Sequence, residues 1–147
     1  MQKTDIRFVR LHENAIVPSY GTKSSAGADL YLYAESDVVI EPGETVLVHT
    51  GIAMEIPEGY AGLVFARSGL ATKRNLAPAN KVGLIDSDYR GEIMIPLHNH
   101  GSKAQTLSPG ERVAQIVFMP YLCADFVEAE TLSDTARGLG GFGSTGK

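Results

Sequence analysis

The sequence contains a single cysteine, Cys123, so no disulfide can form within the chain. Such sparing use of cysteine is typical of a reducing compartment, and a cytoplasmic location is expected. Long hydrophobic runs are also lacking, because the longest one, 116–124, contains Pro120 and is far shorter than the roughly 20 residues of a membrane-spanning helix. No apolar segment follows the opening residues MQKTD, so neither a signal peptide nor a contact with a membrane is expected.

An excess of positive charge is missing as well. The chain has 13 lysines and arginines against 17 aspartates and glutamates, which gives a net charge of -4. Proteins that coat nucleic acid are usually basic, so no nucleic-acid partner is expected. The 44% of hydrophobic and 20% of charged residues are typical of a globular protein and argue against disorder, collagen and coiled coil. A length of 147 residues predicts one compact unit.

Short apolar or alternating runs, separated by turn-forming residues, dominate the sequence. The turns contain proline and glycine, as in 41–44, 57–59 and 108–111, because proline presets φ and glycine accepts a positive φ. The runs are rich in Val, Ile, Tyr and Phe, which favour strands. The predicted strands are 6–11, 28–33, 38–40, 46–50, 52–56, 61–65, 81–85, 92–98 and 113–119. Many short strands with frequent turns indicate an all-β sandwich, jelly roll or barrel.

Two segments depart from this pattern. Residues 68–75 (SGLATKRN) lack alternation and begin with Ser68, which can cap a helix, so one short helix is predicted there. From Leu132 onward the chain becomes rich in glycine. A tail of this kind is usually a disordered end. Because glycines let backbone amides converge on an anion and Arg137 adds a guanidinium, a lid that closes over phosphate is the alternative.

Several polar groups are candidates for chemistry, each with a structural alternative. Arg67, Ser68 and Gly69 form either an anion site at a helix start or a capped helix with a surface arginine. The segment DSDYRG between two apolar runs is interpreted as the tip of a long hairpin. There Asp86 and Asp88 either solvate the loop or provide a general base or a metal partner next to Tyr89.

Three other residue types are weighed in the same way. His98 and His100 are expected on one side of a strand, where structural or exposed histidines are favoured over a zinc site. Cys123 is expected to be a small buried side chain. Phe142 lies in the polar tail, where an aromatic ring is expected to stack on a ligand or partner.

Taken together, five ordered blocks between about Arg7 and Lys147 resemble the trimeric dUTPase family (deoxyuridine 5'-triphosphate nucleotidohydrolases). The blocks are AGADLYLY from Ala26, ARSGLA from Ala66, NKVGLIDSDYRGE from Asn80, RVAQIVF from Arg112 and RGLGGFGSTG from Arg137. One block alone is weak, but five in order are highly specific.

The resemblance implies a fold, an assembly and a reaction. The fold would be all-β, a jelly-roll-like distorted barrel with one short helix and a flexible glycine-rich C-terminal tail. Residues 1–131 would form this domain, and 132–147 a lid contributed to the active site of a neighbouring subunit in a homotrimer with shared sites. The enzyme would be a Mg2+-dependent hydrolase that converts dUTP and water to dUMP and pyrophosphate, which clears dUTP from the nucleotide pool and supplies dUMP for thymidylate synthesis.

Residue roles follow from the same resemblance, position by position. Asp86 matches the general base that activates the water attacking the α-phosphate, and Asp29 matches an acid near the base and the metal-bound waters. Tyr89 would lie under the deoxyribose, and Arg112 would be structural or at the interface. The other implied substrate ligands are Asn80, Val82, Gly83, Ile85 and Met94 for uracil; Arg67, Ser68, Gly69 and Gln115 for the phosphate chain; Arg137, Gly143, Ser144 and Thr145 for the γ-phosphate; and Phe142 stacked over uracil.

Three other functions compete with this one. A dCTP deaminase of the same fold needs a glutamate on the strand after the hairpin, where this chain has Pro96, with Glu92 out of register. A catalytically silent binding domain would be expected to lose Asp86 or the tail, and both are present. A viral-type jelly-roll structural protein is the third alternative, since fold alone implies no function. The grouping of Arg67, Asp86, Tyr89, Arg137 and Phe142 in their motifs argues against it.

Overall fold

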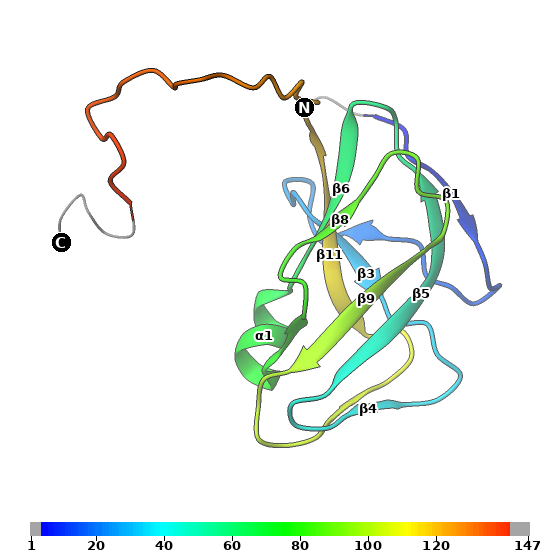
Figure 1. Cartoon of the computed structure of the whole chain (residues 1–147). Helices are drawn as coiled ribbons and strands as arrows, with labels where there is room; N and C mark the ends of the chain where they lie inside the picture. The colour runs from blue at the N-terminus through cyan, green and yellow to red at the C-terminus, as the bar shows by residue number, and fades with distance from the viewer. Residues whose placement is uncertain (1–3, 142–147) are drawn as a thin grey trace.

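The chain folds into two β-sheets that pack against each other, with one short helix at their side (Figure 1). The computed structural model describes residues 4–141. One sheet has the order β1 (Arg7–Arg10), β5 (Thr45–Glu55), β9 (Glu92–Asn99), β7 (Leu76–Pro78). The other has the order β2 (Ser19–Tyr20), β3 (Ala28–Tyr31), β11 (Arg112–Pro120), β6 (Tyr60–Phe65), β8 (Gly83–Ile85). A two-stranded ribbon joins β10 (Gln105–Leu107) to β4 (Val38–Ile40).

The predicted all-β fold with one short helix is confirmed, although the strands of residues 4–141 form separate sheets and do not close a barrel. The alternating pattern explains the packing of the central strand β9, where Ile93, Ile95 and Leu97 are fully buried and the residues between them are partly exposed. Side chains of both sheets meet in one hydrophobic core. Every run predicted as a strand lies on a strand of the structure, whereas the short strands β2, β7 and β10 were not predicted.

The two strands predicted over 46–50 and 52–56 are a single strand, β5. Its pairing with β9 shifts between His49 and Ala53, and Gly51 between them has φ +68°. A β-carbon on Gly51 would come 2.7 Å from the β-carbon of Ala15. Gly51 therefore marks a bulge within one continuous strand, where two separate strands were predicted.

The helix α1 (Ser68–Arg74) begins at the predicted residue and ends one residue before the predicted end. Arg67 is the N-cap, and no side chain caps the helix, so the expected capping role of Ser68 is wrong. Asn75 ends the helix in the left-handed conformation with φ 55°, and its N–H bonds to the Leu70 carbonyl. Arg67 lies two residues after the end of β6 and immediately before α1, so its backbone is held between two regular elements.

The segment DSDYRG is not the tip of a hairpin. β8 before it pairs with β6, and β9 after it pairs with β5 and β7, so these two strands belong to different sheets. Residues 86–91 therefore form a loop that crosses from one sheet to the other. The sequence pattern predicts two strands and a turn, but which partner each strand takes depends on distant residues.

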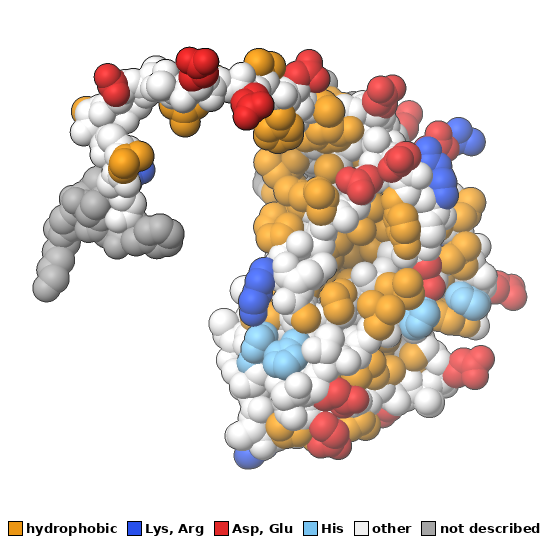
Figure 2. Space-filling view, viewed as in Figure 1, with side chains coloured by type: hydrophobic (Ala, Val, Ile, Leu, Met, Phe, Trp, Pro, Cys, Tyr) orange, Lys and Arg blue, Asp and Glu red, His pale blue; other side chains and the backbone are white. Residues whose placement is uncertain are grey.

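The chain leaves the body of the protein after β11. Residues 121–139 are all exposed, and Figure 1 shows this stretch running clear of both sheets. Hydrophobic side chains lie along it in Figure 2, and Leu122 and Phe126 are 97% and 99% exposed. Cys123 is exposed as well, so its predicted burial is wrong, because the strand that carries the core ends at Pro120. Within 4–141, no helix is both long and apolar enough to span a membrane.

Candidate active site

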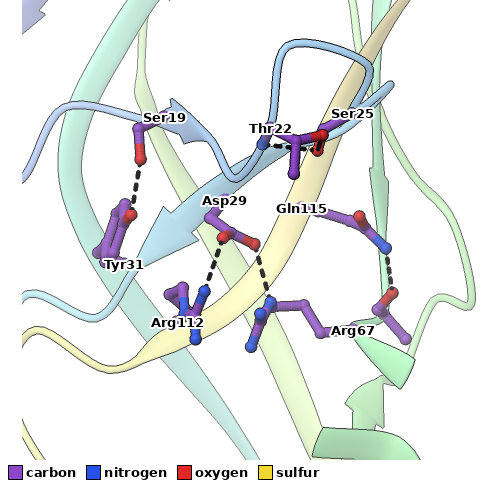
Figure 3. A network of polar contacts seen from close by, with 9 residues as sticks. Ser19, Thr22, Ser25, Asp29, Tyr31, Arg67, Arg112 and Gln115 are labelled. Atoms are coloured by element: carbon purple, nitrogen blue, oxygen red, sulfur yellow. Dashed lines mark hydrogen bonds and ion pairs between the residues drawn. The ribbon is translucent and has the colours of Figure 1, made fainter. Parts of the chain in front are cut away.

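Asp29 on β3 holds two arginines that arrive from different elements (Figure 3). Arg67 Nε donates to Asp29 Oδ1 at 2.8 Å, and Arg112 Nη1 donates to Asp29 Oδ2 at 3.3 Å. The Asp29 side chain is 13% exposed, so the ion pairs lie in partly desolvated surroundings. The carboxylate thus neutralises one of two positive charges and fixes the direction of Arg67.

An open cavity of about 680 Å³ lies beside this arginine pair. Its lining includes Arg67, Ser68, Gly69 and Gln115, so the structure brings together the four residues predicted to bind the phosphate chain. Gln115 Nε2 donates to the Ala66 carbonyl at 2.9 Å. A β-carbon on Gly27 would come 2.7 Å from Gln115 Oε1, so glycine leaves room for this amide. Two arginines against one aspartate give the cavity a positive balance that suits an anion.

Asp29→Ala is expected to lower the free energy of unfolding by about 1–3 kcal/mol, because Arg67 would lose its partly buried acceptor. Chemical denaturation of the variant measures this change. Asp37→Ala is the control, since Asp37 is also an aspartate but is exposed. Equal effects of the two substitutions would contradict a structural role for the Asp29 clamp.

A second pocket, of about 210 Å³, lies at the crossing between the two sheets. The predicted site residues Ile85, Asp86, Tyr89 and Met94 line it, together with Leu47, Leu84 and Glu92. β8 and β9 diverge here because they pair with different strands, so the pocket forms in the wedge between them. Asp86 is exposed and also lines an adjoining cavity of about 680 Å³, which leaves its carboxylate accessible to water.

The remaining predicted uracil ligands follow the edge of the second sheet. β8 is its last strand, with β6 on one side and no described strand on the other. Asn80 precedes β8 in a tight turn, in which Val82 N–H donates to the Asn80 carbonyl at 2.7 Å. The Asn80 amide lies close to Gly83, where a β-carbon would be 3.2 Å from Asn80 Nδ2. An edge strand presents backbone donors and acceptors that a ligand can use.

Glu92 ties the crossing loop to the bulge in β5. Its Oε1 accepts the Gly51 N–H at 2.7 Å, and its Oε2 lies 2.8 Å from His49 Nδ1. Burial raises the pKa of the Glu92 carboxyl, but the bonds from His49 and Gly51 outweigh it and hold the pKa below its usual value. Glu92 is therefore an ionised structural group at the base of the second pocket.

Within residues 4–141, the predicted site residues fall into two groups around different cavities. None of the residues around the Asp86 and Tyr89 pocket also lines the cavity of Arg67. Arg137 is exposed and lines neither cavity, and Figure 1 shows the segment after β11 running clear of both sheets. Phe142, Gly143, Ser144 and Thr145 lie outside the described residues, so the predictions for them stay predictions. The residue predicted to activate water and the residues predicted to bind phosphate thus lie around different cavities of the chain.

The described residues do not provide a cage for a resident metal ion. Within 4–141, no three of the His, Cys, Asp and Glu side chains gather as such ligands do. Both oxygens of Asp29 are already engaged by arginines. Mg2+ is commonly held by substrate phosphates and only one or two carboxylates, so these residues fit an ion that arrives with a phosphate chain. His98 and His100 stack edge to face on one side, as expected, with ring centroids 4.4 Å apart.

Sequence reasoning missed four residues around the second pocket and its loop. Leu47, Leu84, Gly91 and Glu92 were not predicted as site residues, although the last three lie within the block NKVGLIDSDYRGE, because their proximity depends on the crossing of the two sheets. Gly27 was also missed, although it lies within the block AGADLYLY. A glycine two residues before Asp29 was the one local sign that the backbone next to β3 passes close to another side chain, which is that of Gln115.

Comparison with known proteins assigns a family to this arrangement. The family model described as dUTPase matches residues 13–146. The deoxyuridine 5'-triphosphate nucleotidohydrolase of Desulfitobacterium hafniense is 48% identical over 145 residues, which cover 98% of this chain and 96% of that protein. Among solved structures, the dUTPase of Staphylococcus bacteriophage 80alpha with dUPNHPP has a TM-score of 0.90 and 29% identity, covering 99% of this chain and 100% of that one.

A second phage enzyme is similar in fold. The dUTPase of phage phi11 of S. aureus, whose structure shows the coordination of a structural Mg(II) ion, has a TM-score of 0.79 and 27% identity. It covers 87% of this chain and 98% of its own. A family model that matches almost the whole chain, together with a relative nearly half identical along its length, shows that this chain belongs to the dUTPase family.

Proposed function

We propose that this protein hydrolyses dUTP to dUMP and pyrophosphate, and so removes dUTP from the nucleotide pool. The observation that carries the proposal is the pair of half-sites: an arginine-lined cavity around Arg67, and a pocket that holds the accessible carboxylate of Asp86. Membership of the dUTPase family supports it. So does the bound dUTP analogue dUPNHPP in the phage 80alpha relative.

The uracil ring is proposed to bind along the free edge of β8, with Asn80 and the backbone of Val82, Gly83 and Ile85 reading its polar edge. Met94 lies on the opposite wall of the wedge. Backbone pressed against C5 leaves no room for the methyl group of thymine. Backbone N–H groups placed to donate to the C4 carbonyl of uracil would face the C4 amino group of cytosine and stay unpaired. A buried unpaired donor costs free energy, so the site would discriminate strongly against cytosine. The deoxyribose is proposed to lie on Tyr89, where a 2'-hydroxyl of ribose would clash.

The triphosphate is proposed to bind in the cavity of Arg67, Ser68, Gly69 and Gln115. Asp29 serves there to orient Arg67, since both of its oxygens accept bonds from arginines. A Mg2+ ion bound together with the triphosphate beside Arg67, Ser68, Gly69 and Gln115 would supply charge withdrawal from the phosphate oxygens. The arginines add to that stabilisation as charge develops during the reaction.

The chemistry assigned to Asp86 is general base catalysis. Its carboxylate accepts a proton from a water molecule while the water oxygen forms a bond to the α-phosphorus. The bond from the α-phosphorus to the bridging oxygen breaks, and pyrophosphate leaves with that electron pair. The α-phosphate, now with the oxygen of water, is the phosphate of dUMP.

Complete sites are proposed to form between subunits of a homotrimer. Because Asp86 and Arg67 line different cavities of one chain, a neighbouring copy can supply the half that each lacks. The exposed hydrophobic side chains of the segment after Pro120 are expected to be covered by a neighbour. Residues 132–147, with Arg137, Phe142, Gly143, Ser144 and Thr145, are proposed to close over uracil and the γ-phosphate of that neighbour's site.

A panel of nucleotides tests the function. With Mg2+, pyrophosphate is expected from dUTP and at least about a hundredfold less from dTTP, dCTP and UTP, while ammonia stays absent. Ammonia from dCTP would revive the deaminase alternative, although Glu92 is bound to Gly51 and His49 and position 96 is proline. If the folded protein releases neither pyrophosphate nor ammonia from any of the four nucleotides, the proposed hydrolysis is contradicted and a binding domain is left as the alternative.

A further inference from the structure

The side chain of Tyr89 folds back onto the backbone of its own loop. Its hydroxyl donates to the Glu92 carbonyl at 3.0 Å. Its ring covers Gly91 so closely that a β-carbon there would lie 2.6 Å from Tyr89 Cζ and 3.0 Å from Cε2. Carbon atoms in contact are usually 3.5–4.0 Å apart. Only glycine at position 91 therefore lets the phenol lie where it does.

The backbone that carries the phenol is itself held in place. The carboxylate of Glu92, whose carbonyl accepts the Tyr89 hydroxyl, bonds to the Gly51 N–H at 2.7 Å in the bulge of β5. The same carboxylate pairs with His49 on that strand. The loop is thus anchored to the first sheet at the residue that positions the ring.

We propose that Gly91 and Glu92 form a seat for Tyr89 and that this seat makes Gly91 a specificity-determining residue for the sugar. The inference rests on the proposed function, in which the deoxyribose lies on Tyr89. Because the hydroxyl of Tyr89 is bound to the Glu92 carbonyl, the ring meets the sugar with its flat face and not with a polar group. The distance between the ring face of Tyr89 and the backbone of Gly91 decides whether the 2'-hydroxyl of a ribose fits above the ring.

An alanine at position 91 would act on the ring and not on the fold. The atoms that its β-carbon would meet belong to the end of a rotatable side chain that is 39% exposed, so the ring can swing outward. The φ angle of Gly91 does not lie between +20° and +160°, so alanine can adopt it. The substitution therefore moves Tyr89 while the loop and its bond to Gly51 remain.

A double-mutant cycle tests the seat. The ratio of kcat/KM for dUTP to that for UTP is measured in the unaltered protein, Gly91→Ala, Tyr89→Ala and the double variant. Gly91→Ala is expected to lower the ratio about tenfold or more. In the Tyr89→Ala background the same substitution is expected to change the ratio less than about twofold, since a residue that acts only through its partner has no effect once the partner is gone.

Any other outcome of the cycle overturns the seat, the role of Tyr89 or the proposed function. If Tyr89→Ala lowers the ratio and Gly91→Ala does not, the seat is overturned. If Gly91→Ala lowers the ratio equally in both backgrounds, the effect is general damage to the loop and the seat is again overturned. If Tyr89→Ala leaves the ratio unchanged, both the contact of Tyr89 with the sugar and the role of the seat are overturned. If the unaltered protein does not hydrolyse dUTP, the proposed function itself is overturned. Thermal unfolding within a few degrees (about 4 °C) of the unaltered protein checks the fold of each variant.

Discussion

Asp86→Asn is expected to reduce the turnover of dUTP by about 10²–10⁴-fold while the affinity for dUTP stays nearly unchanged. The amide keeps the size and much of the polarity of the carboxylate but cannot accept a proton from water at neutral pH. The uracil and phosphate ligands are other residues, so binding should survive. Single-turnover hydrolysis measures the chemical step, and titration calorimetry with dUTP measures binding.

Asp88→Asn is the matched control for this prediction. Asp88 lies two residues further along the same loop, is exposed and carries the same charge, but it does not line the pocket of Tyr89. Its turnover is expected to stay within about threefold of the unaltered protein, as is usual for a surface substitution away from bonded groups. Near-normal turnover in Asp86→Asn would remove Asp86 from the mechanism, and equal losses in both variants would indicate a general effect of loop charge.

Deletion of 135–147 is expected to lower kcat/KM for dUTP by about a hundredfold or more, because the site would lose its lid and its contacts to the γ-phosphate. The body of the fold should be unaffected, since the deleted residues that the structure describes are exposed, apart from the half-buried Gly140, and the core ends with β11. Light scattering is expected to report the same oligomer as for the full chain. A truncated protein with full activity would show that the lid proposal is wrong.

Mixing these two inactive variants tests whether sites are shared between subunits. The Asp86→Asn chain keeps its tail, and the truncated chain keeps its carboxylate. If each site takes Asp86 and the tail from different subunits, refolding the two chains together regenerates some complete sites and activity returns. If both come from the same subunit, every site in the mixed oligomer lacks one group, and the mixture stays as inactive as its parts.

Much of the fold was predictable because its information is local. The alternation Ile93, Ile95, Leu97 identifies a strand with one buried face, and the break in alternation after Phe65 identifies the helix Ser68–Arg74. These patterns depend on the period of the backbone and need no knowledge of the partner strand. The site residues were named from motif resemblance in the same way, since each block is contiguous in the sequence.

Contacts between distant residues were not predictable in this way. The clamp of Asp29 on Arg67 and Arg112 spans 38 and 83 positions, and no local pattern connects them. Two separate strands were predicted on either side of Gly51, because a glycine between two apolar runs does not show whether the strand continues through it as a bulge. Cys123 was expected in the core, although the chain has already left the body by then.

The sequence by itself determined most of the strands, the short helix and the family of this protein, because side-chain periodicity and contiguous motifs are properties of the chain. Only the tertiary structure decided that residues 86–91 cross between sheets, that the phenol of Tyr89 rests on Gly91, and that Asp86 and Arg67 line separate cavities. Strand partners are chosen by the packing of two whole faces against each other, and this choice places residues side by side that local patterns treat as unrelated.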